Sequence, residues 1–196
     1  MQKAAECYVK ANMINKAVKI YEELRLFETA GNICAEAAQA ERAAAFYTKA
    51  AEAELGLNNH VKASVIYRNK LSDVPSAEQT LLNGWFADKD AVNCLYHYFI
   101  ATDDKLRQNK MIEFHEQQIT KKTNPLFLNV IKKVYTKGEA VKPEMRDLIF
   151  RIIIDSYEDD PYILKELKFL NPDDRKLVAD VLHYHNLRLK KKRLGT

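Results

Sequence analysis

The sequence predicts an all-α protein in which short stacked helical hairpins are followed by a more globular helical region. Only five glycines and five prolines occur among the 196 residues. That is too few for a β-protein, which must reverse direction about every 8–12 residues. Apolar residues make up 47% of the chain and the net charge is only +4, which excludes a disordered chain. The third observation is a repeat of 13 residues in the first part of the chain.

The repeat consists of four blocks of 13 residues that align without gaps. The first column of the alignment holds Ala4, Ala17, Ala30 and Ala43. The fifth column holds Tyr8, Tyr21, Cys34 and Tyr47, and the eighth column holds Ala11, Leu24, Ala37 and Ala50. A fifth unit begins at Ala63, seven residues later than the period requires, which is about two helical turns.

This spacing predicts short helices broken by tight turns. Separations of four and three residues place the first, fifth and eighth columns on one helix face. Thirteen steps of ~100° do not return to the same face, so a single continuous helix would spread the pattern around its circumference. The alanines allow helix axes to approach closely, and the tyrosines fill the space between them. Because short helices are weak alone, the stack is expected to hold by burying shared faces.

The pattern over residues 4–71 resembles the tetratricopeptide-repeat-like (TPR-like) α-solenoids, in which antiparallel helix pairs stack into a superhelix. Two blocks of 13 residues would form one hairpin, a compact version of that family's ~34-residue unit. The resemblance implies a binding scaffold and assigns no binding residue.

The second part of the chain, residues 76–196, is expected to form about seven helices without the 13-residue period. The motifs expected to begin or end them are a break at Ser72–Pro75, a capping box of Ser76 with Gln79, a start at Asp103–Asp104, Asn124 with Pro125, a stop at Gly138 after Lys137, Lys142–Pro143–Glu144, Asp160–Pro161 and Asn171–Pro172. The helix over residues 145–157 is apolar nearly all round, and we expect it to be the central buried one. A strand over Ile152–Ile154 is the competing interpretation, although no partner strand is predicted. We expect regions 1–71 and 76–196 to pack together as one continuous unit.

The cysteines and the N-terminus indicate an intracellular protein. Cys7, Cys34 and Cys94 are odd in number and lack CxxC spacing, which is typical of small buried side chains in a reducing compartment. The N-terminal residues contain no signal peptide, and no apolar run approaches the ~20 residues of a membrane helix. Met1 leads almost directly into the repeat without a good N-cap. We therefore expect a C-terminal fragment of a larger intracellular protein, cytoplasmic or nuclear.

Candidate catalytic and metal-ligating groups have simpler structural interpretations. The pairs Asp103–Asp104, Asp159–Asp160 and Asp173–Asp174 lie at predicted helix starts, where carboxylates cap free N–H groups. Cys94 and His97 are two potential ligands without a third or fourth, and His183 and His185 lie on different faces of a helix. The serines lack a nucleophile motif, and the glycines are too dispersed for a phosphate loop. We expect no catalytic residue, no cofactor and no metal.

The excess positive charge is concentrated at the C-terminus. Residues 1–100 carry 11 basic and 12 acidic side chains, whereas the tail alone contains Arg188, Lys190, Lys191, Lys192 and Arg193. This tail has three interpretations: a solvated helix end, an electrostatic contact for nucleic acid or an acidic partner, or a nuclear-import signal. The aromatic residues Trp85, Phe86, Tyr96, Tyr98 and Phe99 have helical spacing that favours core packing over base stacking.

The leading functional hypothesis is a non-catalytic scaffold that binds a partner protein or a neighbouring domain of its parent chain. Solenoid surfaces are extended and concave, which suits a peptide or a helix. Polar residues of the repeat are expected to face outward, and some could line that surface: Lys10, Lys19, Glu23, Glu36 and Lys49. The alternatives are a nucleic-acid-binding domain that uses the basic tail and an accessory region that regulates a catalytic domain elsewhere in the parent chain.

Overall fold

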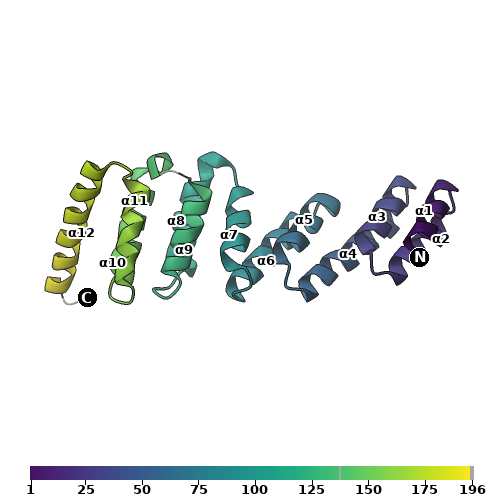
Figure 1. Cartoon of the computed structure of the whole chain (residues 1–196), viewed down its shortest axis with the longest axis horizontal. Helices are drawn as coiled ribbons and strands as arrows, with labels where there is room; N and C mark the ends of the chain where they lie inside the picture. The colour runs from purple at the N-terminus through teal and green to yellow at the C-terminus, as the bar shows by residue number, and fades with distance from the viewer. Residues whose placement is uncertain (137, 195–196) are drawn as a thin grey trace. The chain divides into compact units, whose positions relative to one another are not determined.

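The structure, a computed structural model, describes residues 1–136 and 138–194, and the side chains of Glu139, Asp174, His185 and Leu194 lie outside that description. The described residues form helices and no strand (Figure 1), which confirms the all-α prediction. The α-helices are α1 (Gln2–Lys10), α2 (Ile14–Glu23), α3 (Phe27–Glu36), α4 (Ala40–Gly56), α5 (His60–Lys70), α6 (Val74–Phe86), α7 (Ala91–Ile100), α8 (Asp104–Gln118), α9 (Asn124–Val134), α10 (Pro143–Ser156), α11 (Leu167–Leu170) and α12 (Asp174–Leu194). Two 3-10 helices, η1 (Gly138–Ala140) and η2 (Pro161–Glu166), complete the elements.

The chain divides into two compact units, and the division falls within α7. Unit 1 is Met1–Cys94 and unit 2 is Leu95–Thr196. The expected regions 1–71 and 76–196, and their packing as one continuous unit, stay predictions.

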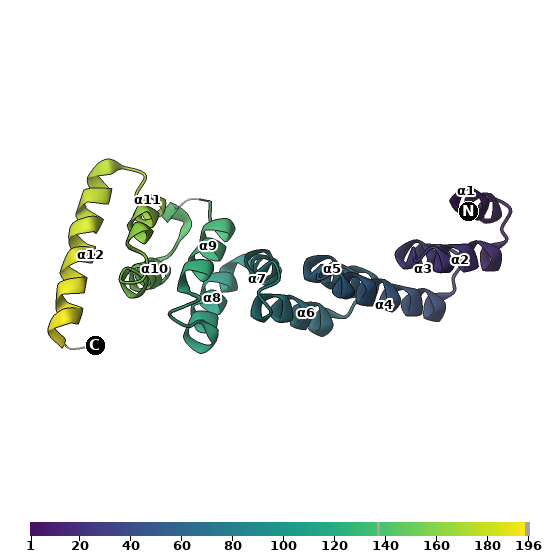
Figure 2. The same ribbon diagram turned by 60° about the horizontal axis from the view of Figure 1, so that its bottom comes forward.

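In unit 1 each helix packs against the next one along the chain, from α1 through α6. Figure 2 shows these helices following one another in sequence order. Helices α2 and α3 contain ten residues each, so the 13-residue period is one such helix plus a three-residue link, and α1 is one residue shorter. Helix α4 has 17 residues. The late start of the fifth block is therefore an extension of α4 and not a longer loop.

The first five links of unit 1 each contain one residue with a left-handed backbone. A residue with positive φ ends each of the helices α1 to α5: Asn12 (54°), Arg25 (57°), Ala38 (59°), Asn58 (61°) and Ser72 (55°). In the first four links the next N–H donates to the carbonyl five residues earlier, in the pairs Met13 to Tyr8, Leu26 to Tyr21, Gln39 to Cys34 and Asn59 to Glu54, at 2.8–2.9 Å. This pattern is the Schellman motif, which satisfies carbonyl groups at a helix C-terminus. The residue that ends the motif is also the N-cap of the next helix.

The left-handed residue fixes where the repeated alanine lies in the next helix. In each of the five links the first-column alanine, or its equivalent Ala77 in α6, comes five residues after the positive φ. All five of these alanines are at most 3% exposed: Ala17, Ala30, Ala43, Ala63 and Ala77. The link at Ser72 therefore keeps the left-handed residue and the alanine spacing of the earlier links, although the N–H of Asp73 donates to the carbonyl of Tyr67, six residues earlier (2.9 Å).

The predicted burial of the other columns is correct for most of the fifth column and wrong for most of the eighth. Tyr21, Cys34 and Tyr47 of the fifth column are buried. The eighth column is not a general contact position, because Ala11, Leu24 and Ala37 are the C-caps of their helices and are exposed or half-buried. Only Ala50, inside the longer α4, is buried. Ala4 and Cys7 are exposed on α1, which corrects the expectation that they are buried.

Unit 2 is built around α10, as the sequence predicts. Met145, Leu148, Ile149, Ile152 and Ile153 of this helix are fully buried, and α10 packs against α8, α9, η2 and α12. The helix continues through Ile152–Ile154, so the competing strand interpretation is wrong.

Two polar side chains join segments of unit 2 that are far apart in sequence. The buried Gln108 amide donates to the carbonyl of Ala140 (3.0 Å) and accepts from the N–H of Lys142 (2.8 Å). Arg146 donates to the carbonyl of Leu170 (3.2 Å) and to the Asn171 side chain (2.9 Å), and it pairs with Asp180. These bonds fix the positions of η1, α10, α11 and α12 relative to one another.

Several helix ends differ from the expected motifs. Asp73 caps α6 by accepting from the Ser76 N–H (3.0 Å), so the expected Ser76–Gln79 capping box is wrong. Asn124 lies inside α9 and bonds His115 (2.9 Å), while Thr123 is the N-cap. Helix α9 ends at Val134, before the expected stop at Gly138, and Lys137 lies outside the described residues. Asp173, and not Asn171, bonds the first turn of α12.

The close approach of α3 and α4 generates a first prediction. A Cβ on Gly31 would lie 2.6 Å from Cε1 of Tyr47, whose hydroxyl is held by Asn32 (2.9 Å), whereas a Cβ on Gly56 would meet nothing within 4 Å. We expect Gly31→Ala to lower the free energy of unfolding by ~1–3 kcal/mol through overpacking. Gly56→Ala, the matched control, should raise it by up to ~1 kcal/mol through lower backbone entropy. Urea unfolding measures both, and equal effects would contradict the close approach.

The left-handed link generates a second prediction at Ala38, whose φ is 59°. A left-handed conformation costs a non-glycine residue ~1–2 kcal/mol, while glycine in the unfolded chain costs ~0.4–1 kcal/mol in entropy. We therefore expect Ala38→Gly to stabilise the protein by about 0.5–1 kcal/mol. Ala37→Gly, with φ of −83°, should destabilise it. A loss of stability in Ala38→Gly would show that the residue is not left-handed.

Candidate interaction surfaces

The five basic residues of the predicted tail do not form one surface. All lie on α12, but the Arg188 guanidinium lies 4.1 Å from the centre of the Tyr157 ring and Lys191 pairs with Asp155 at 2.6 Å. Lys190, Lys192 and Arg193 are exposed. Two of the five cations thus take part in interactions within unit 2, and three face solvent.

Helix α12 has an inner side that packs and an outer side that does not. On the inner side Tyr184 is 3% exposed and Asp180 pairs with Arg146. On the outer side Val178 and Leu182 are each 60% exposed and Leu189 is 43% exposed. Their separations of four and seven residues place them in one stripe along the helix.

Cations flank this stripe. Arg175, Lys192 and Arg193 are exposed and share the side of α12 that carries the three apolar residues. We call these six residues, Arg175, Val178, Leu182, Leu189, Lys192 and Arg193, the outer face of α12. The charge of the tail does not indicate this face, whereas the spacing of Val178, Leu182 and Leu189 in the sequence is a signal for an apolar stripe.

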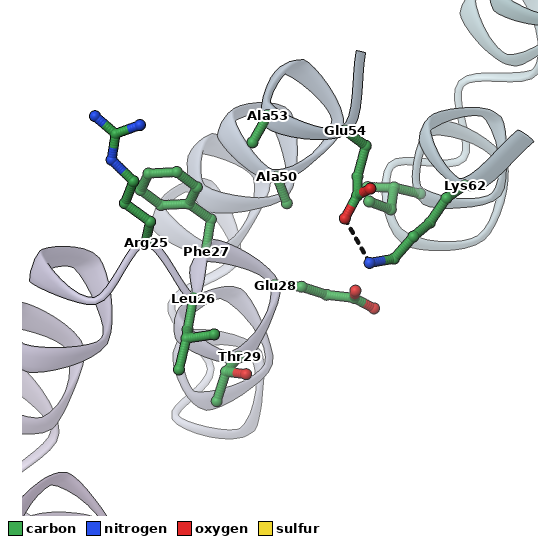
Figure 3. Close-up of a pocket in the computed structure, with 10 residues that line it drawn as sticks. Arg25, Leu26, Phe27, Glu28, Thr29, Ala50, Ala53, Glu54 and Lys62 are labelled. Atoms are coloured by element: carbon green, nitrogen blue, oxygen red, sulfur yellow. Dashed lines mark hydrogen bonds and ion pairs between the residues drawn. The ribbon is translucent and has the colours of Figure 1, made fainter. Parts of the chain in front are cut away.

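The second candidate surface is a hollow in unit 1, between the start of α3, the last turns of α4 and the first turns of α5 (Figure 3). Its volume is about 180 Å³, and its apolar walls are Leu26, Phe27, Ala50, Ala53 and Ile66. We call it the unit 1 groove. It lies where α4 extends two turns further than the preceding helices, and α4 contributes Ala50, Ala53 and Glu54 to its lining.

The charged residues at the rim of the unit 1 groove come from α3, α4, α5 and the link between α2 and α3, which contributes Arg25. Glu54 of α4 pairs with Lys62 of α5 and also accepts from the Asn59 side chain (2.9 Å). Burial raises the pKa of the Glu54 carboxyl, but the hydrogen bonds from Lys62 and Asn59 outweigh it and hold that pKa below its usual value. The hydrogen bond that Lys62 donates to Glu54 raises the pKa of Lys62, and the charge of Glu28 adds to that effect. The Glu28 carboxylate points toward Lys62 across the groove (Figure 3).

The outward polar residues of the repeat are placed as expected but do not line the groove. Lys10, Lys19, Glu23, Glu36 and Lys49 are all exposed. Lys49 pairs with Glu22 at 2.6 Å and so joins α4 to α2.

The aromatic residues considered for base stacking pack mostly into the fold. Trp85 is 6% exposed and Phe99 is fully buried, while Tyr96 and Tyr98 are half-buried. Phe86 is the exception, with 58% of its surface exposed.

The paired carboxylates cap helices, as expected. Asp103 accepts from the Lys105 N–H (2.9 Å), Asp160 from the Tyr162 N–H (3.0 Å), and Asp173 from the Arg175 N–H (2.9 Å). Across the part of the chain that the structure describes, His, Cys, Asp and Glu do not gather in threes as a metal site requires.

The buried thiol and the histidines also have structural positions. Cys94 is buried against Lys89, whose carbonyl accepts from the thiol at 3.5 Å, and burial raises the pKa of Cys94 to about 11. His183 packs edge-on against Phe150, with ring centres 5.5 Å apart. The side chain of His185 lies outside the described residues.

Comparisons of the chain with protein families, with curated proteins and with solved structures returned no match. Among the described residues, the helices are too short or too polar to cross a membrane.

The division of the basic tail generates a third prediction. Arg188→Ala removes the contact with the Tyr157 ring and should lower the free energy of unfolding by ~0.5–2 kcal/mol. Lys190→Ala changes an exposed cation on the same helix and should stay within ~0.5 kcal/mol of the parent. Urea unfolding measures both changes. If Arg188→Ala were as neutral as Lys190→Ala, the tail would be a uniformly solvated cationic segment.

Proposed function

We propose that this chain is a non-catalytic helical scaffold of the TPR-like α-solenoid type, and that unit 1 binds a segment of a partner protein in the unit 1 groove. The observation that carries the proposal is the hollow between α3, α4 and α5, which has apolar walls and a charged rim and lies beside the extended end of α4. The regular links and the repeated alanine contacts support the solenoid assignment, because each helix in such a stack buries its face mainly against its neighbours.

The size of the groove favours a protein segment over a small molecule. Small-molecule sites enclose ~300–1,000 Å³, whereas the unit 1 groove encloses about 180 Å³. That volume suits one large apolar side chain of a partner, packed against Phe27 and Ile66. Glu28 at the rim would then bond a donor of the partner's backbone or side chain.

The basic tail gives less support to the alternative of nucleic-acid binding. Arg188 and Lys191 are engaged with Tyr157 and Asp155, so fewer cations remain for phosphate contacts. The role of an accessory region for a catalytic domain is compatible with the same groove. An intracellular location is part of the proposal, and the buried free thiols Cys34 and Cys94 support it.

Selection of binders from an unbiased peptide display library against the whole chain tests the proposal. We expect an enriched class of peptides that share one large apolar residue. Ala53→Trp should fill the groove and weaken their binding at least tenfold in fluorescence anisotropy. Ala53 is exposed, so this substitution should leave the fold intact, which circular dichroism checks.

Ala45→Trp is the matched control, because Ala45 is also exposed on α4 but lies away from the groove. It should leave peptide binding unchanged. Failure to enrich any peptide, or equal binding to both variants, would contradict a binding site in the groove.

A further inference from the structure

The outer face of α12 lies in unit 2, separate from the unit 1 groove, and it is an apolar helix face without a packing partner among the described residues. A helix on the surface of a protein ordinarily presents polar residues to solvent. Here Val178 and Leu182 expose 60% of their surfaces and Leu189 exposes 43%. Single exposed apolar residues are common, but three in one stripe on one helix mark a contact site.

The spacing of the stripe matches a helical partner. Val178, Leu182 and Leu189 are four and seven residues apart, which is the spacing of the seam between two helices packed side by side. Helix α12 has 21 residues and is therefore ~30 Å long, enough for several turns of a second helix to lie along it.

The charges of the outer face define the chemistry of that helix. Along the helix, Arg175 precedes the stripe, and Lys192 and Arg193 follow it. The carboxylates of α12 whose side chains are described do not offset them, because Asp180 pairs with Arg146 on the inner side. Asp173, which precedes the helix, accepts from a backbone N–H at its start. The outer face thus combines an apolar centre with cationic ends.

From this combination we propose that the outer face of α12 is the docking site of an amphipathic helix of a partner protein, in which carboxylates flank an apolar stripe. The apolar stripe supplies the contact area, and the carboxylates of the partner pair with Arg175, Lys192 and Arg193. A nucleic acid would use the cations but not the stripe, so the stripe favours a protein helix.

A pair of synthetic peptides tests the proposal on the whole chain. The probe is a fluorescein-labelled 21-residue helix with leucine along one stripe and glutamate on both flanks, and its twin has lysine in place of each glutamate. We expect the glutamate peptide to bind at least tenfold more tightly than the lysine twin, with an affinity that falls as salt is added. Equal binding of the two peptides, or no binding of either, would overturn the proposal.

Variants of the chain locate the site. Leu182→Asp should weaken binding of the glutamate peptide at least tenfold. Leu106→Asp should leave it unchanged, since Leu106 is 61% exposed on α8. The double change K192E/R193E should reverse the preference, so that the lysine twin binds more tightly than the glutamate peptide. Both leucines are exposed, so the variants should fold, and circular dichroism verifies that they do.

Other occupants give different results. Tighter binding to a 20-base-pair duplex or to phosphatidylserine vesicles than to the glutamate peptide, lost in K192E/R193E but kept in Leu182→Asp, would replace the proposal with a purely electrostatic surface. A dimer in sedimentation that Leu182→Asp dissociates would identify a second copy of this chain as the occupant and overturn the proposal. Ala53→Trp should change none of these results, so this site and the unit 1 groove are tested independently.

Discussion

The arrangement of unit 1 depends on a left-handed residue in each link between its first six helices. At Asn12, Arg25, Ala38, Asn58 and Ser72 the backbone has a φ between 54° and 61°, a conformation that glycine adopts readily and other residues adopt at a cost of ~1–2 kcal/mol. The conformation reverses the chain within three residues. In the first four links it also lets the next N–H close the preceding helix. The same residue that ends one helix therefore determines where the next begins.

The contacts of unit 1 follow from that constraint. Because Ala17, Ala30, Ala43 and Ala63 each come five residues after a link, each lies at the same place in its helix, where it is at most 3% exposed. A close-packed interior leaves little room for a larger side chain at such a position. At the contact of α3 and α4 the fit is closer still, and Gly31 lies directly against Tyr47. Where α4 runs on for two further turns it still packs against α3 and α5, and the unit 1 groove lies between the three helices. The regular links thus account for the buried alanines, and the length of α4 accounts for the groove.

Unit 2 is organised differently, through a buried apolar helix and a few long-range polar bonds. The surrounding helices pack against the buried face of α10. Gln108 bonds the backbone at Ala140 and Lys142, and Arg146 bonds the backbone and side chains near Leu170 and Asn171. The same contrast separates what the sequence predicts from what it does not. Helical periodicity located most helices and the buried face of α10, because these depend on neighbouring residues. A bond such as that between Arg146 and Asp180, 34 residues apart, has no local signal.

The period of 13 residues predicted the buried alanines but not the link, since Arg25 and Ala38 give no sign of a left-handed backbone. For that reason the period predicts a contact for the eighth column, where the structure has a C-cap in α1, α2 and α3. The seven-residue delay before Ala63 was visible in the sequence, yet an extended helix and a longer loop fit it equally, so the groove could not be anticipated.

NMR spectroscopy tests the origin of the repeat most directly. The measured quantities are the HN–Hα couplings and Cα chemical shifts of Asn12, Arg25, Ala38 and Asn58. The account predicts left-handed values at all four residues, each flanked by helical values on the N-terminal side. Helical or extended values at Arg25 and Ala38 would contradict it.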